Sequence, residues 1–226
     1  PGREISLETG GIYHLVNKSI GSQAIFTKPR DYQRALETVL FYQNSQPPLR
    51  YSYFFRLPAS HRNKILQDLN DKPDHLVSLI AYCFLPNHFH LLIRQEKENG
   101  TSKFMSQFAN SYTRYFNTKR RLQGPIFQGK FKAVQIESTE QLIHVSRYIH
   151  LNPYSAGVIN NLKAIADYPY SSFGEYVALH HTAYCQKDIF LNLFTRPNSY
   201  KDFVFNQADY QRQLQIIKHL LAEITP

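Results

Sequence analysis

The middle of the chain reads Phe84-Leu85-Pro86-Asn87-His88-Phe89-His90-Leu91-Leu92-Ile93. Two histidines flank one phenylalanine inside an otherwise apolar run, and Pro86-Asn87 before them is a turn signal. Side chains alternate between the two faces of a strand, so His88 and His90 share one face and Phe89 lies on the other. The stretch therefore predicts the turn and the second strand of an antiparallel hairpin, with two half-exposed imidazoles side by side.

The patterns on either side of this hairpin predict an α+β fold. Alternating residues indicate strands, and apolar residues at helical spacing indicate helices. The strands are expected over 11–18, 75–84, 88–94 and 127–136, and the helices over 32–42, 62–69, 102–121 and 138–152. Pro153 is expected to end the last helix, because the residue before a proline avoids the helical region.

This order, up to the fourth strand, is that of a ferredoxin-like (RRM-like) antiparallel sheet with helices. The helix over 138–152 is then an addition that carries a second motif. The residue pattern changes after Val158. We expect a domain over 11–176, followed by a mainly helical C-terminal extension over 177–226 of unknown role. The aromatic-rich stretch 51–57 fits neither a helix nor a strand clearly.

The composition favours a nucleic-acid partner. The formal charge of the 226 residues is +9, and a basic excess of this size suits a polyanion. With 16 Tyr and 16 Phe, the chain also has rings that could stack on unpaired bases, although many of them must form the core. Cys83 and Cys185 are far apart and form no CxxC, so we expect no disulfide framework and a cytoplasmic location. No apolar run is long enough to predict a membrane span.

The second motif reads Tyr148-Ile149-His150-Leu151-Asn152-Pro153. Tyr148 and Asn152 are spaced i, i+4 and share one helix face, with His144 one turn earlier. If this face packs over His88 and His90, two imidazoles, an amide oxygen and a phenol converge. Nitrogen and oxygen ligands of this kind can hold a divalent cation, which would polarise a phosphate. The phenol of Tyr148 would then be the nucleophile, with help to lose a proton whose ordinary pKa is ~10.

Simpler interpretations remain open for each of these residues. His-x-His is short enough to occur by chance, and a lone histidine such as His14 or His144 is more often packed than a ligand. Tyr112 is an alternative nucleophile, but no Asn or Gln follows it at i+4. The candidate phosphate contacts are basic residues that could equally form a solvated face: Lys119, Arg120, Arg121, Lys130 and Lys132.

Five segments together resemble the single-tyrosine transposases of the HUH superfamily, and their REP-associated branch in particular. Each is a weak signal by itself, but the order is that of the family. The segments are Gly11-Ile12-Tyr13-His14-Leu15 with Ala24-Ile25-Phe26, Leu85 to His90, Gly124 to Phe131, Tyr148 to Pro153, and Tyr168-Pro169-Tyr170-Ser171-Ser172.

The resemblance implies a function and a set of site residues. It implies Mg²⁺ or Mn²⁺ held by His88, His90 and Asn152, and a covalent 5′-phosphotyrosine at Tyr148 with a free 3′-hydroxyl. It also implies single-stranded or hairpin DNA as the substrate, and a monomer or a homodimer. In the insertion-sequence branch the third ligand is usually glutamine, so Asn152 favours the REP-associated branch.

Two other functions compete with a transposase. A nickase or rolling-circle initiator of the same superfamily would use similar chemistry, but such enzymes often place the tyrosine differently or carry two. A sheet that only binds single-stranded nucleic acid is the other alternative. A pure binder has no need of His-x-His together with Tyr148 and Asn152, which favours the transposase.

Overall fold

The computed structural model describes residues 6–71, 73–179, 184–194, 196 and 199–213. Its centre is a four-stranded sheet in the order β2-β3-β1-β4, in which every neighbouring pair is antiparallel. The strands are β1 (Ile12–Lys18), β2 (Val77–Leu85), β3 (His88–Gln95) and β4 (Lys132–Ile136). The first strand lies in the middle and the hairpin partner β2 lies at one edge. This is the strand order of a ferredoxin-like sheet, and the predicted α+β class is confirmed.

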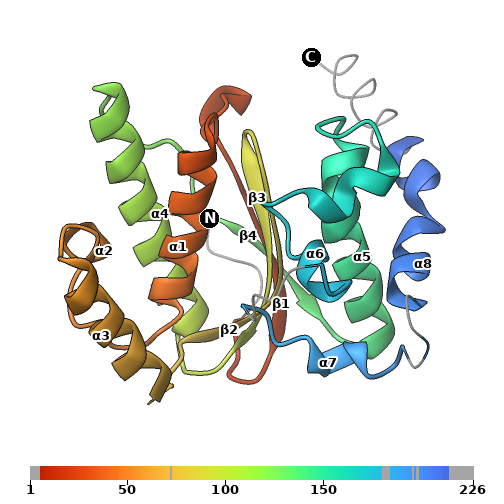
Figure 1. Cartoon of the computed structure of the whole chain (residues 1–226), viewed down its shortest axis with the longest axis horizontal. Helices are drawn as coiled ribbons and strands as arrows, with labels where there is room; N and C mark the ends of the chain where they lie inside the picture. The colour runs from red at the N-terminus through yellow and green to blue at the C-terminus, as the bar shows by residue number, and fades with distance from the viewer. Residues whose placement is uncertain (1–5, 72, 180–183, 195, 197–198, 214–226) are drawn as a thin grey trace.

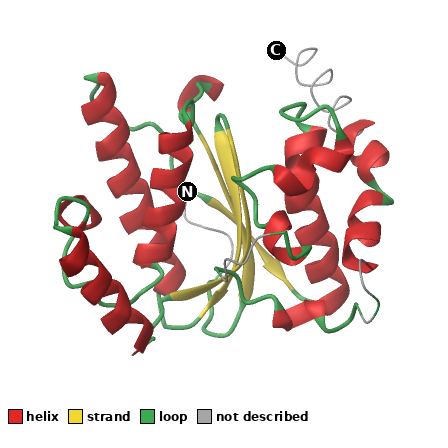
Figure 2. Ribbon diagram, in the orientation of Figure 1, coloured by secondary structure: helices red, strands yellow, loops and turns green. Residues whose placement is uncertain are grey.

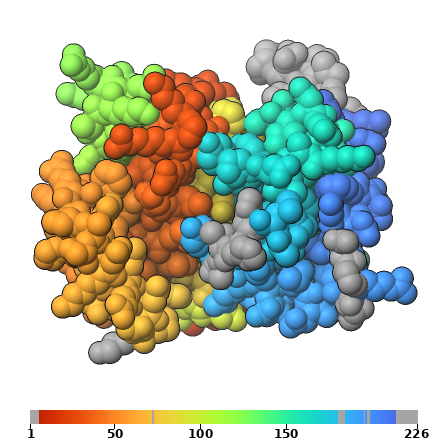
Figure 3. Space-filling view, viewed as in Figure 1, coloured from red at the N-terminus to blue at the C-terminus, as the bar shows by residue number. Residues whose placement is uncertain are grey.

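Helices cover both faces of the sheet (Figures 1 and 2). One layer contains α1 (Pro29–Tyr42), α2 (Tyr51–Phe54), α3 (Ala59–Asp71) and α4 (Gly100–Arg120). The other contains α5 (Thr139–Ser155), α6 (Phe173–Tyr176), α7 (Asp188–Leu191) and α8 (Ser199–Phe205). Two 3₁₀ turns, Ile20–Ser22 and Leu162–Asp167, connect these elements. In the space-filling view the two layers form separate halves on either side of the sheet (Figure 3).

Alternation along β3 decides what each layer packs against. Phe89 and the ring of Phe108 on α4 are 5.1 Å apart, so the face that carries Phe89 belongs to the α1–α4 layer. His90 therefore faces the other layer, where Tyr148 of α5 lies against it. The helices of each layer turn an apolar stripe toward the sheet, and both faces of the sheet are therefore buried.

One predicted strand boundary was wrong, and one undecided stretch proved helical. The strand expected over 127–136 begins only at Lys132, because Gly129 takes a left-handed conformation with φ 58° that interrupts an extended chain. Phe127 makes only an isolated bridge with Ser19. The aromatic stretch 51–57, which fitted neither pattern clearly, forms the short helix α2.

Pro153 does not end α5. The helix continues to Ser155 with Pro153 inside its last turn. A proline removes the backbone N–H that would bond the carbonyl of Ile149, so the helix loses a bond there without stopping. Ala156 still donates its N–H to the carbonyl of Asn152 at 2.9 Å, which completes the C-terminal end.

The described part of the extension packs on the same core as the rest of the chain. Phe190, Tyr200 and Val204 are buried and belong to one hydrophobic cluster with the sheet residues. The division into a domain over 11–176 and an extension stays a prediction. None of the helices in the described ranges is long and apolar enough to cross a membrane.

Candidate active site

The pairing of β1 with β3 gathers three side chains beside the two histidines. Lys18 is opposite His88, and Val16 is opposite His90. Residues directly opposite each other in a sheet point to the same face, with Cβ atoms ~5 Å apart. His14, two positions before Val16, lies on that face as well.

His90 is held in place by one ring nitrogen and leaves the other without a partner. Its Nδ1 shares a hydrogen bond of 2.9 Å with Nε2 of His14, and the two rings stack with centroids 5.1 Å apart. Its Nε2 is buried and has no hydrogen-bond partner. Only 4% of His90 is exposed, so the expectation of a half-exposed histidine was wrong, because the added helix α5 covers this face.

His88 has the same arrangement at the start of the strand. It is half-buried, and its Nδ1 donates to Oδ1 of Asn87 at 2.7 Å. In this tautomer Nε2 carries the lone pair, and the same holds for His90 if its Nδ1 donates to His14. A histidine that binds a metal usually donates its other N–H in this way.

Both candidate ligands are uncharged at neutral pH. Burial lowers the pKa of His88 to about 4, with a further lowering from Lys18, and it lowers the pKa of His90 well below its ordinary value. Burial also lowers the pKa of His14 to about 4. Cation binding requires neutral imidazoles, and the surroundings provide that state.

Tyr148 reaches this face from α5. The centroid of its ring is 5.5 Å from that of His90 and 6.0 Å from that of His14, both edge-on. Asn152 follows one helical turn later and is only 1% exposed. Its Nδ2 donates to the carbonyl of Tyr148 at 2.9 Å, which leaves Oδ1 as the amide atom able to act as a ligand. The structure thus brings Tyr148 next to His90, one of the two histidines of the His-x-His pattern.

The phenol of Tyr148 is protonated in these surroundings. Burial raises its pKa above the ordinary value, and hydrogen bonding with the side chain of Asn152 offsets this only in part. A nucleophilic role therefore needs a nearby cation or base that helps to remove the phenol proton.

The donor set fits a divalent cation. No three His, Cys, Asp or Glu side chains within the described ranges gather in a way that could hold a metal. Two imidazoles with an amide oxygen form a different, mixed nitrogen and oxygen set, which can hold a divalent cation when a phosphate and water complete it. The unpartnered Nε2 of His90 supports this fit, because a buried polar atom without a partner costs free energy.

Two residues considered in the sequence lie away from this face. Tyr112 is fully buried on the opposite side of the sheet, and its hydroxyl donates to the carbonyl of Ile25 at 2.9 Å. Burial raises its phenol pKa. The ring of His144 lies against Phe203 of α8, and its Nδ1 shares a hydrogen bond with Arg147.

The basic residues predicted to contact phosphates differ in whether they are exposed or already bound to another side chain. Arg121, Lys130 and Lys132 are exposed, and Lys132 lies opposite Val16 on the histidine face. Arg120 donates to Oγ1 of Thr27 at 2.9 Å. The ammonium of Lys119 is bound to the buried carboxylate of Asp31, which points to a structural role for that lysine.

Two residues beside the site gave only a weak signal in the sequence. Lys18 is exposed beside His88 and makes no ion pair within the described part of the chain, yet it was not singled out. His14 was treated as an ordinary packed histidine. The spacing of His14 and Lys18 along an alternating strand was visible, but only the register of β1 against β3 shows that they lie next to His90 and His88.

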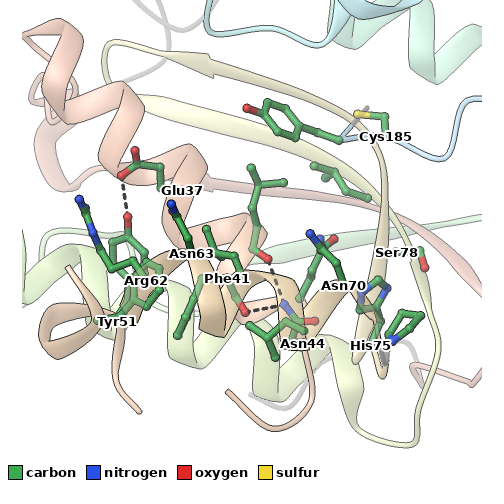
Figure 4. Close-up of a pocket in the computed structure, with 18 of the residues that line it drawn as sticks. Glu37, Phe41, Asn44, Tyr51, Arg62, Asn63, Asn70, His75, Ser78 and Cys185 are labelled. Atoms are coloured by element: carbon green, nitrogen blue, oxygen red, sulfur yellow. Dashed lines mark hydrogen bonds between the residues drawn. The ribbon is translucent and has the colours of Figure 1, made fainter. Parts of the chain in front are cut away.

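Two hollows in the described structure lie elsewhere. One, of about 760 Å³, opens between α1, α3 and the edge strand β2, with Glu37, Tyr51 and Arg62 around part of its wall (Figure 4). The other, of about 1200 Å³, follows α4 and is lined in part by Arg114 and Arg121. Neither includes His88, His90 or Tyr148, so the candidate site rests on side-chain geometry rather than on cavity size.

Comparison with known proteins agrees with the two motifs. Residues 48–152 match the family model of the IS200-like transposases, and this range includes His88, His90, Tyr148 and Asn152. A solved structure described as the REP associates tyrosine transposase bound to a REP hairpin has the same fold. It has a TM-score of 0.54 and 18% sequence identity, over 79% of this chain and 86% of that chain. No curated protein matches. Residues 48–152 are thus similar to the IS200-like transposases, and the chain shares the fold of the solved structure.

Proposed function

We propose that this protein is a transposase that cuts and rejoins single-stranded DNA near hairpins, with Tyr148 as the nucleophile and Mg²⁺ or Mn²⁺ held by His88, His90 and Asn152. The observation that carries the proposal is the ring of Tyr148 lying 5.5 Å from that of His90, whose Nε2 is buried without a partner. The similar solved structure is bound to a REP hairpin, which supports hairpin DNA as the substrate.

Each residue has a defined task in this proposal. The neutral Nε2 atoms of His88 and His90 and Oδ1 of Asn152 would be the three protein ligands of the cation. A divalent cation bound there would polarise the scissile phosphate and stabilise its developing charge. His14 fixes the ring of His90 through Nδ1. Lys18 and Lys132 lie on the same face and would bind neighbouring phosphates.

The chemical step exchanges one phosphodiester bond for another. The Oη of Tyr148 attacks phosphorus as the phenol loses its proton. The bond from phosphorus to the 3′ oxygen breaks, and that oxygen leaves as a hydroxyl after gaining a proton. The product is a 5′-phosphotyrosine, which a different 3′-hydroxyl can attack in the reverse sense to join two strands. Because the bond energy is conserved, this suits strand transfer better than hydrolysis.

The test is a denaturing gel of a labelled hairpin oligonucleotide incubated with protein and Mn²⁺. Tyr148→Phe removes one oxygen and keeps the ring, so it should still bind DNA but yield neither a covalent adduct nor a cleaved strand. Tyr112→Phe is the matched control, because it removes a buried hydroxyl on the far side of the sheet. If Tyr148→Phe retains the adduct and Tyr112→Phe loses it, the assignment is wrong.

A further inference from the structure

The motif Tyr148 to Pro153 contains a histidine that the proposed chemistry does not use. His150 is completely buried, and both of its ring nitrogens are engaged. Nδ1 shares a hydrogen bond of 2.7 Å with the hydroxyl of Tyr200, and Nε2 one of 2.8 Å with the hydroxyl of Ser172. Two positions along a helix correspond to ~200°, so His150 points away from the face that presents Tyr148.

Tyr200 belongs to α8, in the extension, and its hydroxyl contacts α5 twice. Besides His150, it shares a hydrogen bond of 3.0 Å with Oγ of Ser146, one turn earlier. The ring of Tyr200 is buried against neighbours that include Phe190. One hydroxyl thus fixes two successive turns of the helix that carries the nucleophile.

The contact continues through α5 to the sheet. The hydroxyl of Ser172, which bonds His150, also accepts the backbone N–H of Tyr82 on β2 at 2.9 Å. Cys83, which follows Tyr82 in β2, lies opposite His90 in the sheet. A continuous series of hydrogen bonds therefore joins α8, α5 and the strand beside the histidines.

A second residue of the extension reaches the nucleophile's own backbone. Nε2 of Gln211 donates to the carbonyl of Tyr148 at 3.1 Å and to Oγ of Ser155 at 3.2 Å. These contacts lie on both sides of Pro153, where the helix lacks one backbone hydrogen bond. The extension supports α5 at the point where the helix is weakest, between Tyr148 and the last turn.

We propose that the C-terminal extension positions the nucleophile helix, with Tyr200 acting through His150 and Gln211 acting through the carbonyl of Tyr148. This rests on the proposed role of Tyr148. A phenol that must approach phosphorus in line tolerates little displacement, since a shift of ~1 Å can slow a reaction ~100-fold. Tyr200, His150 and Gln211 are positioning residues and touch neither DNA nor the reacting atoms.

The experiment compares Tyr200→Phe with Tyr112→Phe. Each variant keeps a buried ring and loses one hydroxyl, but only Tyr200 contacts α5. At saturating oligonucleotide and Mn²⁺, Tyr200→Phe should form the adduct ~10- to 100-fold more slowly in a single turnover. Its Kd for the oligonucleotide should stay within about twofold, because the phosphate contacts are unchanged. Tyr112→Phe should react at the parental rate.

Two outcomes would overturn the proposal. One is an unchanged single-turnover rate in Tyr200→Phe, and the other is an equal loss in both variants, which indicates general destabilisation. Hydrogen exchange separates this proposal from the proposed function. Amides 146–152, 154 and 155 should exchange faster in Tyr200→Phe but not in Tyr112→Phe, whether or not Tyr148 is the nucleophile. If the parental protein forms no adduct while this difference persists, the chemistry is wrong and the positioning contact stands.

Discussion

At the scale of single residues, His14 has the most direct effect on the candidate ligands. It accepts or donates only one hydrogen bond to His90, yet this bond decides which nitrogen of His90 carries a lone pair. A lone histidine in an alternating strand gives no sign of such a role. The sequence could therefore predict His88 and His90 from their spacing, but not the partner that orients one of them.

Replacing His14 with phenylalanine should weaken cation binding. The ring would still pack against Tyr148, while the hydrogen bond to Nδ1 of His90 would be lost. Loss of such an outer partner typically costs 10- to 100-fold in metal affinity, so we expect a drop of about that size for Mn²⁺ by titration calorimetry. His144→Phe is the control, since His144 lies against Phe203. Equal affinities for the two variants would show that His14 does not orient His90.

At the scale of elements, a buried carboxylate joins α1 to α4. Asp31 is 1% exposed and accepts hydrogen bonds from Lys119 and from the hydroxyl of Tyr115, the latter at 2.8 Å. Burial alone would raise its pKa, but these bonds and those from Thr27 hold it at about 2. Lys119 was expected to contact DNA, and no periodicity could have revealed a partner 88 positions earlier.

This carboxylate should make the fold sensitive to acid in a defined range. The pKa of Asp31 is lower in the folded state, at about 2, than the ordinary value of 3.8. The folded state is therefore stabilised above pH 3.8, and that stabilisation is lost as the pH falls toward 2. Since one pKa unit corresponds to about 1.4 kcal/mol, we expect a loss of about 2 kcal/mol over this range. Urea unfolding at pH 4 and pH 2 measures it, and Asp31→Asn should lack this component. The same slope in both proteins would contradict the expectation.

The elements show where sequence patterns succeed. Helical and alternating apolar spacing located the strands and the long helices α4 and α5 correctly, because burial on one face sets that spacing. The patterns failed at Gly129 and Pro153, where a local backbone preference competes with tertiary packing. Gly129 adopted the turn that its lack of a side chain permits, whereas Pro153 remained helical within a well-packed element.

At the scale of the whole molecule, charge should govern how DNA binds. The chain carries +9, and Lys18 and Lys132 lie on the histidine face. For single-stranded DNA, each neutralised phosphate adds about −0.7 to the slope of log K against log salt. Lys132→Gln should make this slope less negative by about that amount, measured by fluorescence anisotropy. Lys64→Gln, exposed on α3 in the other layer, should leave it unchanged. A binding constant independent of salt would exclude a phosphate-dominated interface.

The central place of β1 has a consequence for how the protein is made. Its partners are β3 and β4, which both follow it in the chain, so β1 leaves the ribosome before either partner and stays unpaired on both edges until they emerge. His14 and His90, which meet in the finished sheet, are 76 positions apart in the chain. Contacts of such long range slow folding, because a large loop must close before they form. The residues proposed to bind a cation and cut DNA can therefore come together only after α5 has been synthesised, more than 120 residues after β1.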